Sequence, residues 1–166
     1  MKNFIMLSNF NQWANNKIYT ACRLLNEQEY KKNRKAFFSS IHGTLNHSLI
    51  IDIAYRSRIE GIAHGLKGMN QILFTSLELL SFERKKEDER LINLIKNLKK
   101  NDFDKDITYE GFDSGITTYS ISFILLTLFN HQTHHRGQVH NMLSQAGFKP
   151  PQIDIPDFKE ETNYRF

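Results

Sequence analysis

A helical repeat of apolar side chains between about Ser120 and Ala146 constrains the fold of this chain more than any other feature. Its members are spaced alternately three and four residues apart, which places them on one face of an α-helix, as in the buried face of a bundle helix. The stripe consists of Ile121, Ile124, Leu128, His131, His135, Gln138 and Met142. This pattern predicts a long helix packed against other helices.

Two imidazoles interrupt the apolar stripe at its centre. His131 and His135 are four residues apart, so their Cβ atoms lie about 5–6 Å apart on one face. A buried polar group without a partner costs roughly 1–3 kcal/mol, and a divalent metal would satisfy both ring nitrogens at once. The spacing alone also fits ordinary core histidines bonded to backbone carbonyls. The stripe favours His135 over His134 as the partner of His131, because His134 points to the other side.

Size and composition are those of one globular domain. The 166 residues can bury a core without disulfides, so we expect a single domain over residues 1–166. Apolar residues make up 40% of the chain and charged residues 24%, which is typical of soluble globular proteins. The single cysteine, Cys22, excludes an intrachain disulfide and suits a reducing compartment. It lies among apolar residues at helical spacing, as a small core side chain does.

Charge and hydropathy argue against nucleic-acid and membrane partners. The net charge of +4 comes from 22 basic and 18 acidic residues that are interspersed along the chain. No apolar run reaches the roughly 18 residues of a transmembrane helix, and the apolar N-terminal patch is too short for a signal peptide. We therefore expect a cytoplasmic protein that binds neither nucleic acid nor membranes.

Two helices are predicted in the N-terminal part of the chain. Residues 4–25 carry apolar side chains at steps of three and four, and the polar run 26–35 connects this helix to the next. The second helix extends over about residues 41–60, from a serine N-cap at residue 39 or 40 to a stop at Gly61. It is apolar around much of its circumference, which favours a central place in the fold.

The central helix also carries polar residues, among them Asn46, His47 and Asp52. Taken alone, His47 is typical of a core or rim histidine. A third buried histidine on a second central helix is nevertheless what a metal site on His131 and His135 would need. Asp52 follows His47 by five residues, about 140° round the helix, so we interpret it as a buried structural carboxylate and not as a base.

The remaining segments complete a four-helix pattern. Residues 61–81 are interrupted by glycines and predict a loop with a helical turn over one end of the bundle, and residues 82–100 predict a helix. Residues 107–119 contain two β-prone stretches around a glycine-bounded loop, which indicates a small hairpin. The tail, residues 150–166, is expected as an extended arm whose aromatic residues, including Phe158 and Phe166, pack back on the bundle. The fold class is therefore all-α: a four-helix bundle with at least one long crossover and a small hairpin before the last helix.

Three groups of residues carry a family resemblance that spans nearly the whole chain. They are His131-Gln132-Thr133-His134-His135-Arg136-Gly137-Gln138 with Leu143 and Gly147, Gly43-Thr44-Leu45-Asn46-His47 with Asp52 and Gly61, and Arg84, Asp88 and Leu91 with the region 109–115. On these residues the chain resembles the DinB/YfiT-like superfamily, the damage-inducible DinB family of metal-binding four-helix bundles. The resemblance implies a metal held by His47, His131 and His135, with His134 outside the ligand set. It also implies a homodimer, which the broad apolar cover of the central helix would permit.

Three histidines with an open coordination position are the arrangement of a catalytic metal site. A water bound there can ionise near neutral pH, its pKa falling from 15.7 to about 7, and a thiol would be held as thiolate. All-imidazole ligation suits a divalent transition metal, for which we expect Zn or Ni, with Fe, Cu or Mn as alternatives. Asn46, Gln138 and Arg136 are candidates for orienting ligands or binding an anionic group, and each also has a structural interpretation. Gly137, in mid-helix, predicts close approach by a neighbouring helix or ligand.

The function implied by the resemblance is chemistry on a small molecule. Members of the family look like metal-dependent hydrolases, or like transferases and isomerases that use low-molecular-weight thiols. We therefore expect a metal-dependent enzyme that acts by thiol transfer or hydrolysis, with such a thiol as a candidate partner. The alternative is a non-catalytic metal-binding stress-response protein, in which metal raises the melting temperature but no turnover accompanies it.

Overall fold

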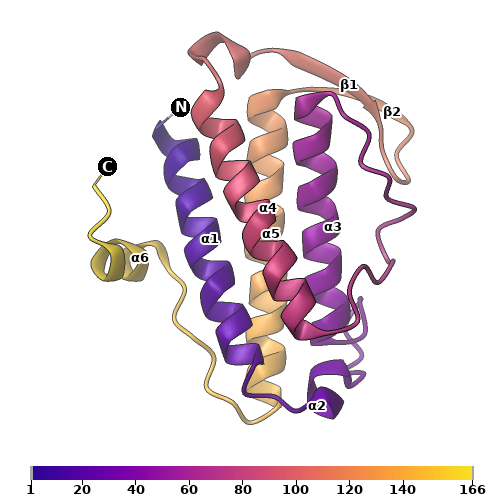
Figure 1. The fold of residues 1–166 in the computed structure, drawn as a ribbon, viewed down its shortest axis with the longest axis vertical. Coiled ribbons are helices and arrows are strands. Elements are labelled where there is room, and N and C mark those ends of the chain that lie inside the picture. Colours follow the sequence, from indigo (N-terminus) through magenta and orange to yellow (C-terminus); the bar gives the residue numbers. More distant parts are fainter. Residues whose placement is uncertain (1, 166) are drawn as a thin grey trace.

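Four long helices form the body of the protein in a computed structural model that describes residues 2–165 (Figure 1). They are α1 (Lys2–Cys22), α3 (Ile41–Glu60), α4 (Leu77–Asn97) and α5 (Ile121–Gln145). The helices α3 and α4 run in the same direction, because residues 61–76 return along the length of the bundle between them. The predicted all-α bundle with a long crossover is confirmed.

Capping groups set both ends of α3, as predicted, and the start of α5. The Ser40 hydroxyl accepts a hydrogen bond from the Gly43 amide at the start of α3, and Gly61 ends this helix with a φ of 68°. The Ser120 hydroxyl accepts from the Phe123 amide to begin α5. Most of α3 is buried inside the bundle, so its apolar breadth is accounted for within one chain. The homodimer remains a prediction.

A β-hairpin lies across one end of the bundle, between α4 and α5 (Figure 1). Its strands, β1 (Asp106–Glu110) and β2 (Ile116–Ser120), pair antiparallel with Tyr109 opposite Thr117. A short 3-10 helix, η1 (Lys100–Asp102), precedes it. The predicted hairpin is confirmed, and its half-buried face, which includes Tyr109 and Thr117, is turned inward.

Several boundaries differ from those expected. The first helix ends at Cys22, and the segment predicted as a polar connection contains the short helix α2 (Glu27–Lys31). This helix forms because Tyr30, only 3% exposed, is drawn into the core. The expected loop over residues 61–81 is also too long, since α4 begins at Leu77 behind the capping hydroxyl of Ser76.

The tail is not the extended arm that the prolines suggested. It contains the helix α6 (Ile155–Thr162), which packs on the outside of α1. Phe158 is 2% exposed, with its ring centroid 5.9 Å from that of Phe10 and 5.6 Å from that of Trp13. The predicted return of the tail to the bundle is therefore confirmed for Phe158, while Phe166 lies outside the described residues.

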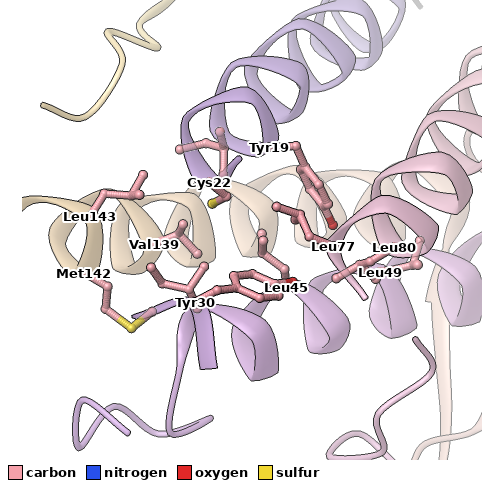
Figure 2. Close-up of a cluster of buried hydrophobic side chains, with 12 residues drawn as sticks. Tyr19, Cys22, Tyr30, Leu45, Leu49, Leu77, Leu80, Val139, Met142 and Leu143 are labelled. Atoms are coloured by element: carbon pink, nitrogen blue, oxygen red, sulfur yellow. The ribbon is translucent and has the colours of Figure 1, made fainter. Parts of the chain in front are cut away.

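Apolar side chains fill the bundle near both ends. Figure 2 shows the cluster nearer α2, where Tyr30 meets side chains from the long helices and Cys22 is fully buried, as predicted. The cluster nearer the hairpin consists of Leu91, Ile95, Phe103, Ile121, Leu125, Leu128 and Phe129. Both clusters hold α3 and α5 at a fixed separation, which fixes the distance between the side chains that face each other between the clusters.

Between the two clusters lies a layer of buried polar side chains. Arg84 forms ion pairs with Asp52 at 2.8 Å and with Asp88 at 2.9 Å. Arg136, 5% exposed, donates to Asn15 at 3.2 Å inside the bundle, so this guanidinium is a structural group and not a binding site for an anionic substrate. The layer consists of Asn11, Asn15, Asp52, Arg84, Asp88, Gln132 and Arg136.

Candidate metal centre

Three imidazoles converge between α3 and α5. The Nε2 atom of His131 lies 3.0 Å from Nε2 of His47 and 3.0 Å from Nε2 of His135. One potential ligand nitrogen from each of the three lies within 4.8 Å of the other two. The structure thus brings together the three histidines singled out from the sequence, and a cluster of this kind could hold a metal ion.

The position of the cluster follows from the helical stripe. On α5 the apolar members of the stripe are buried, His135 is 5% exposed and His131 is half-buried. His47, 4% exposed, faces them from α3. His134 is exposed and lies outside the cluster, so the stripe distinguished correctly between the two neighbouring histidines.

The outer ring nitrogens of two histidines have hydrogen-bond acceptors. Nδ1 of His47 lies 3.0 Å from the main-chain oxygen of Met69, and Nδ1 of His135 lies 2.8 Å from Oε1 of Gln138. A carbonyl oxygen only accepts, so each Nδ1 carries the proton and donates. In the neutral ring the lone pair is then on Nε2, which points towards His131. Gln138 thus contacts one of the predicted ligands, and its role in orienting a metal ligand remains a prediction.

The inner nitrogens therefore present lone pairs to one another. A proton on Nε2 of His131 could be donated to only one of its two neighbours, so the lone pair of the other neighbour, also 3.0 Å away, would have no donor. A divalent cation accepts all three lone pairs. Two nitrogens that each lie about 2.0–2.1 Å from one ion, at roughly a right angle, are about 3 Å apart. The donor set fits a divalent transition metal.

Burial keeps these rings in the form that binds metals. Burial, reinforced by the neighbouring imidazoles, lowers the pKa of His131 from 6.5 to about 3. Burial likewise lowers the pKa of His135 to about 4, and it lowers the pKa of His47. The imidazoles are consequently neutral near pH 7, so protons do not compete for the nitrogens there.

Asn46 acts on the site through the crossover loop. Its Oδ1 accepts hydrogen bonds from the amides of Leu73 at 2.9 Å and Phe74 at 3.0 Å, and its Nδ2 donates to the Phe74 carbonyl at 3.2 Å. These bonds fix the loop whose Met69 carbonyl accepts from His47. Asn46 therefore positions a ligand indirectly, and does not touch it as one sequence interpretation allowed.

Phe38 forms an aromatic wall of the site that sequence analysis missed. Its ring is stacked on that of His47, with centroids 3.8 Å apart and an angle of 18° between planes, and it meets the His135 ring edge-on at 5.5 Å. The residue precedes α3 in an irregular segment, so no helical period indicates its role. The contact restricts the orientation of His47 and shields one side of the cluster from water.

Gln132 is the second residue that the sequence did not reveal as part of the site. Its Nε2 donates to the Ser48 carbonyl at 2.9 Å and to Oδ1 of Asp52 at 2.6 Å. Asp52 is 0% exposed, which confirms its interpretation as a buried carboxylate away from the histidine face. The sequence signal that could have pointed to Gln132 is its position: it is an amide on the buried side of α5 and directly follows the candidate ligand His131.

The expectation for Gly137 is wrong. A Cβ atom built at this position meets nothing within 4 Å, and the residue is exposed. Neither a helix nor a ligand site approaches it closely, so the glycine costs helix stability without the packing reason that we expected.

Within residues 2–165, no helix is both long enough and apolar enough to cross a bilayer.

Comparisons with known proteins agree with the fold. Residues 1–165 match the sequence model of the DinB family. Protein DinB of Bacillus subtilis (strain 168) is 27% identical over 157 residues, which cover 89% of this chain and 88% of that protein. The crystal structure of a DinB-like protein from Bacillus cereus superposes with a TM-score of 0.67 at 18% identity, covering 93% of this chain and 97% of the other. At that identity the likeness concerns the fold alone.

Proposed function

This chain belongs to the DinB family, and on that premise we propose that His47, His131 and His135 bind a divalent transition metal that promotes a reaction of a small molecule, by thiol transfer or hydrolysis. The observation that supports the proposal is the convergence of the Nε2 atoms of three histidines. Three ligands leave at least one coordination position open, as in catalytic metal sites.

When bound, the metal would lower the pKa of a coordinated water to about 7 or hold a thiol as thiolate, which supplies a nucleophile at neutral pH. The protein would contribute fixed ligand geometry. The Met69 carbonyl and the Gln138 amide keep the protons of His47 and His135 on Nδ1. Phe38 excludes water from one side, so that substrate approaches from another.

The nitrogen-only donor set supports Zn or Ni as the metal, with Fe, Cu or Mn as alternatives, because imidazole is a borderline ligand that suits all of these better than Mg or Ca. Elemental analysis of the purified protein, followed by equilibrium dialysis with each metal, identifies the preferred ion. We expect one ion per chain at saturation.

The test compares the wild-type chain with His131→Ala and the control His134→Ala. Metal-loaded wild type is expected to bind one ion per chain and to turn over an electrophile with a low-molecular-weight thiol, or an ester with water. His131→Ala should lose both properties, and His134→Ala should keep them. If metal raises the melting temperature of the wild type but no turnover is measured, the non-catalytic stress-response alternative is favoured. Equal metal binding by wild type and His131→Ala would refute the site itself.

A further inference from the structure

A cavity of about 430 Å³ lies beside the histidine cluster, bounded by α3, α5, the crossover loop and the hairpin. Its lining includes Met69, whose carbonyl accepts the hydrogen bond from His47. Ile51 and Thr127 also line it, each one helical turn from a cluster residue, His47 on α3 and His131 on α5. The lining of the cavity thus comes within one helical turn of two cluster histidines, although none of the three histidines lines it.

The lining also includes Arg58, whose positive charge has no carboxylate partner among residues 2–165. The Arg58 guanidinium lies over the Tyr109 ring, with Cζ 4.2 Å from its centroid, and 5.4 Å from the centroids of Tyr55 and Phe112. Within residues 2–165, its hydrogen bonding is limited to the Glu110 carbonyl, which accepts from Nη2 at 3.1 Å. The Glu110 carbonyl occupies one of the five N–H donors of this arginine, so the guanidinium retains donors for a further acceptor.

The cavity also offers a buried hydroxyl that has no hydrogen-bond partner among the described residues. Oγ1 of Thr117 is buried and has no hydrogen bond to any group in the described chain, although Thr117 lines the cavity opposite Tyr109 in the hairpin. Buried hydroxyls in native proteins are nearly always bonded, so a group that enters the cavity is the natural partner. The remaining wall is largely aromatic, with Phe112 and Phe123 among its members.

We propose that this cavity binds the substrate of the metal site, and that the substrate is a small organic carboxylate with a flat apolar body. The carboxylate pairs with Arg58, the Thr117 hydroxyl bonds a polar atom of the ligand, and the apolar body extends past Phe112 towards the histidines. The assignment of this ligand as a substrate rests on the proposed function; its binding to the cavity does not.

The single arginine of the cavity suits a carboxylate better than a phosphate. A single guanidinium neutralises one negative charge and matches the two oxygens of a carboxylate in a planar, bidentate pair. A phosphate dianion would need further cations, and the only other charged residue lining the cavity, as described, is the acidic Asp113. Aromatic walls suit a flat apolar group, which would displace water from them.

The first experiment uses the wild-type chain with its metal removed by a chelator. Phenylpropanoate and its neutral analogue phenylpropanamide are titrated separately, and binding is followed by NMR chemical-shift changes. We expect the acid to bind about tenfold more tightly or better, since a charge-assisted pair with a guanidinium is stronger than a hydrogen bond to a neutral amide. Equal affinities for acid and amide would overturn the proposal without any substitution in the chain.

Variants then locate the charge. Arg58→Gln should weaken binding of the acid about tenfold and leave that of the amide nearly unchanged. Arg90→Gln, which removes the same charge from an arginine on α4 outside the cavity lining, should change neither. Thr117→Val, which removes only the hydroxyl, should weaken both probes severalfold. Retained affinity of Arg58→Gln for the acid would contradict the assignment.

The two proposals fail separately in this design. If the chain binds phenylpropanoate through Arg58 but turns over no substrate, the proposed carboxylate pocket is supported and the proposed enzymatic function is contradicted. If the chain turns over neutral electrophiles but binds the acid and the amide equally, the metal-dependent activity is supported and the carboxylate pocket is contradicted. His131→Ala, tested with the same probes, should bind the acid as the wild type does.

Discussion

The side-chain amide of Gln132 donates a hydrogen bond to the main-chain carbonyl of Ser48 at 2.9 Å. Gln132 follows His131 on α5, and Ser48 follows His47 on α3, so this single bond links the two helices directly beside the histidines. The same Nε2 also donates to Asp52, which places both of its protons in the buried polar layer. The distance between the facing imidazoles is therefore tied to the core of the bundle.

Substitution of Gln132 by Met should weaken both folding and metal binding. Met fills a similar volume but donates no hydrogen bond, so the Ser48 carbonyl and the Asp52 carboxyl each lose a buried donor. We expect the free energy of unfolding to fall by about 2–3 kcal/mol, measured by urea denaturation of the metal-free protein. Metal affinity should fall about tenfold or more, because α5 is no longer fixed against α3 beside the ligands.

The control is Gln145→Met, the same change at an exposed position near the end of α5. It should leave both the unfolding free energy and the metal affinity close to those of the wild type. A Gln132→Met protein as stable as this control, with unchanged affinity, would show that the helices are held apart by the apolar clusters alone.

Gln138→Leu should lower metal affinity while it changes stability little. The Gln138 side chain is half-buried and accepts a hydrogen bond from Nδ1 of His135, which fixes the tautomer and orientation of that ring. Loss of such a partner typically costs 10–100-fold in metal affinity, which competition with a chelating dye would measure. His134→Ala removes only the outer end of the same hydrogen-bonded chain, so its affinity should stay within about threefold of the wild type. Equal losses in the two variants would contradict the orienting role.

Asp52→Asn should destabilise the protein but leave its metal affinity nearly unchanged. Burial raises the pKa of Asp52 to about 7 even though the neighbouring Arg84 lowers it, so burial opposes the ionisation of this carboxyl and offsets part of what its ion pair contributes. Loss of its charge beside Arg84, which keeps Asp88, should therefore cost about 2 kcal/mol, less than is usual for a broken buried pair. Thermal unfolding and the dye competition test both points. Lost turnover at normal metal content and stability would instead identify Asp52 as a base.

The sequence predicted best those helices and strands whose signals lie within their own residues. The helix α3 has a serine cap, a periodic body and a left-handed glycine stop, and its predicted bounds, about residues 41–60, are confirmed. The hairpin was visible from β-prone residues around glycines. The helix α2 was missed because its five residues have a polar composition, and only the long-range burial of Tyr30 stabilises them.

The same holds for the candidate site: residues with a local sequence signal were predicted, and residues whose roles depend on long-range contacts were not. The spacing of His131 and His135 on a stripe indicated two members, whereas His47 depended on a family resemblance, because one histidine in an apolar helix does not identify its partner. Gln132 and the Met69 carbonyl could not be predicted from periodicity. Their roles depend on which helix and loop lie opposite, and the main chain of Met69 has no residue-specific signal.

The metal-free protein should lose stability as the pH is lowered from about 7.5 to about 5.5. The pKa of His131 is lowered from 6.5 to about 3 and that of His135 from 6.5 to about 4, both by burial. Between these values the unfolded chain binds protons that the folded chain refuses, so the stability present above pH 6.5 declines as the pH falls towards the folded values. Near pH 5.5 each ring should contribute a loss on the order of 1 kcal/mol.

Urea unfolding with a chelator present, at both pH values, measures this loss. Other groups also titrate in the range, so the informative quantity is the difference between the wild type and the double variant His131→Gln/His135→Gln. The wild type should lose about 2 kcal/mol more than the variant on acidification, because the variant has no buried imidazoles at these two positions to resist protonation. Equal losses of stability in the wild type and the double variant would contradict the prediction. They would mean that both rings are protonated as readily in the folded protein as in the unfolded chain.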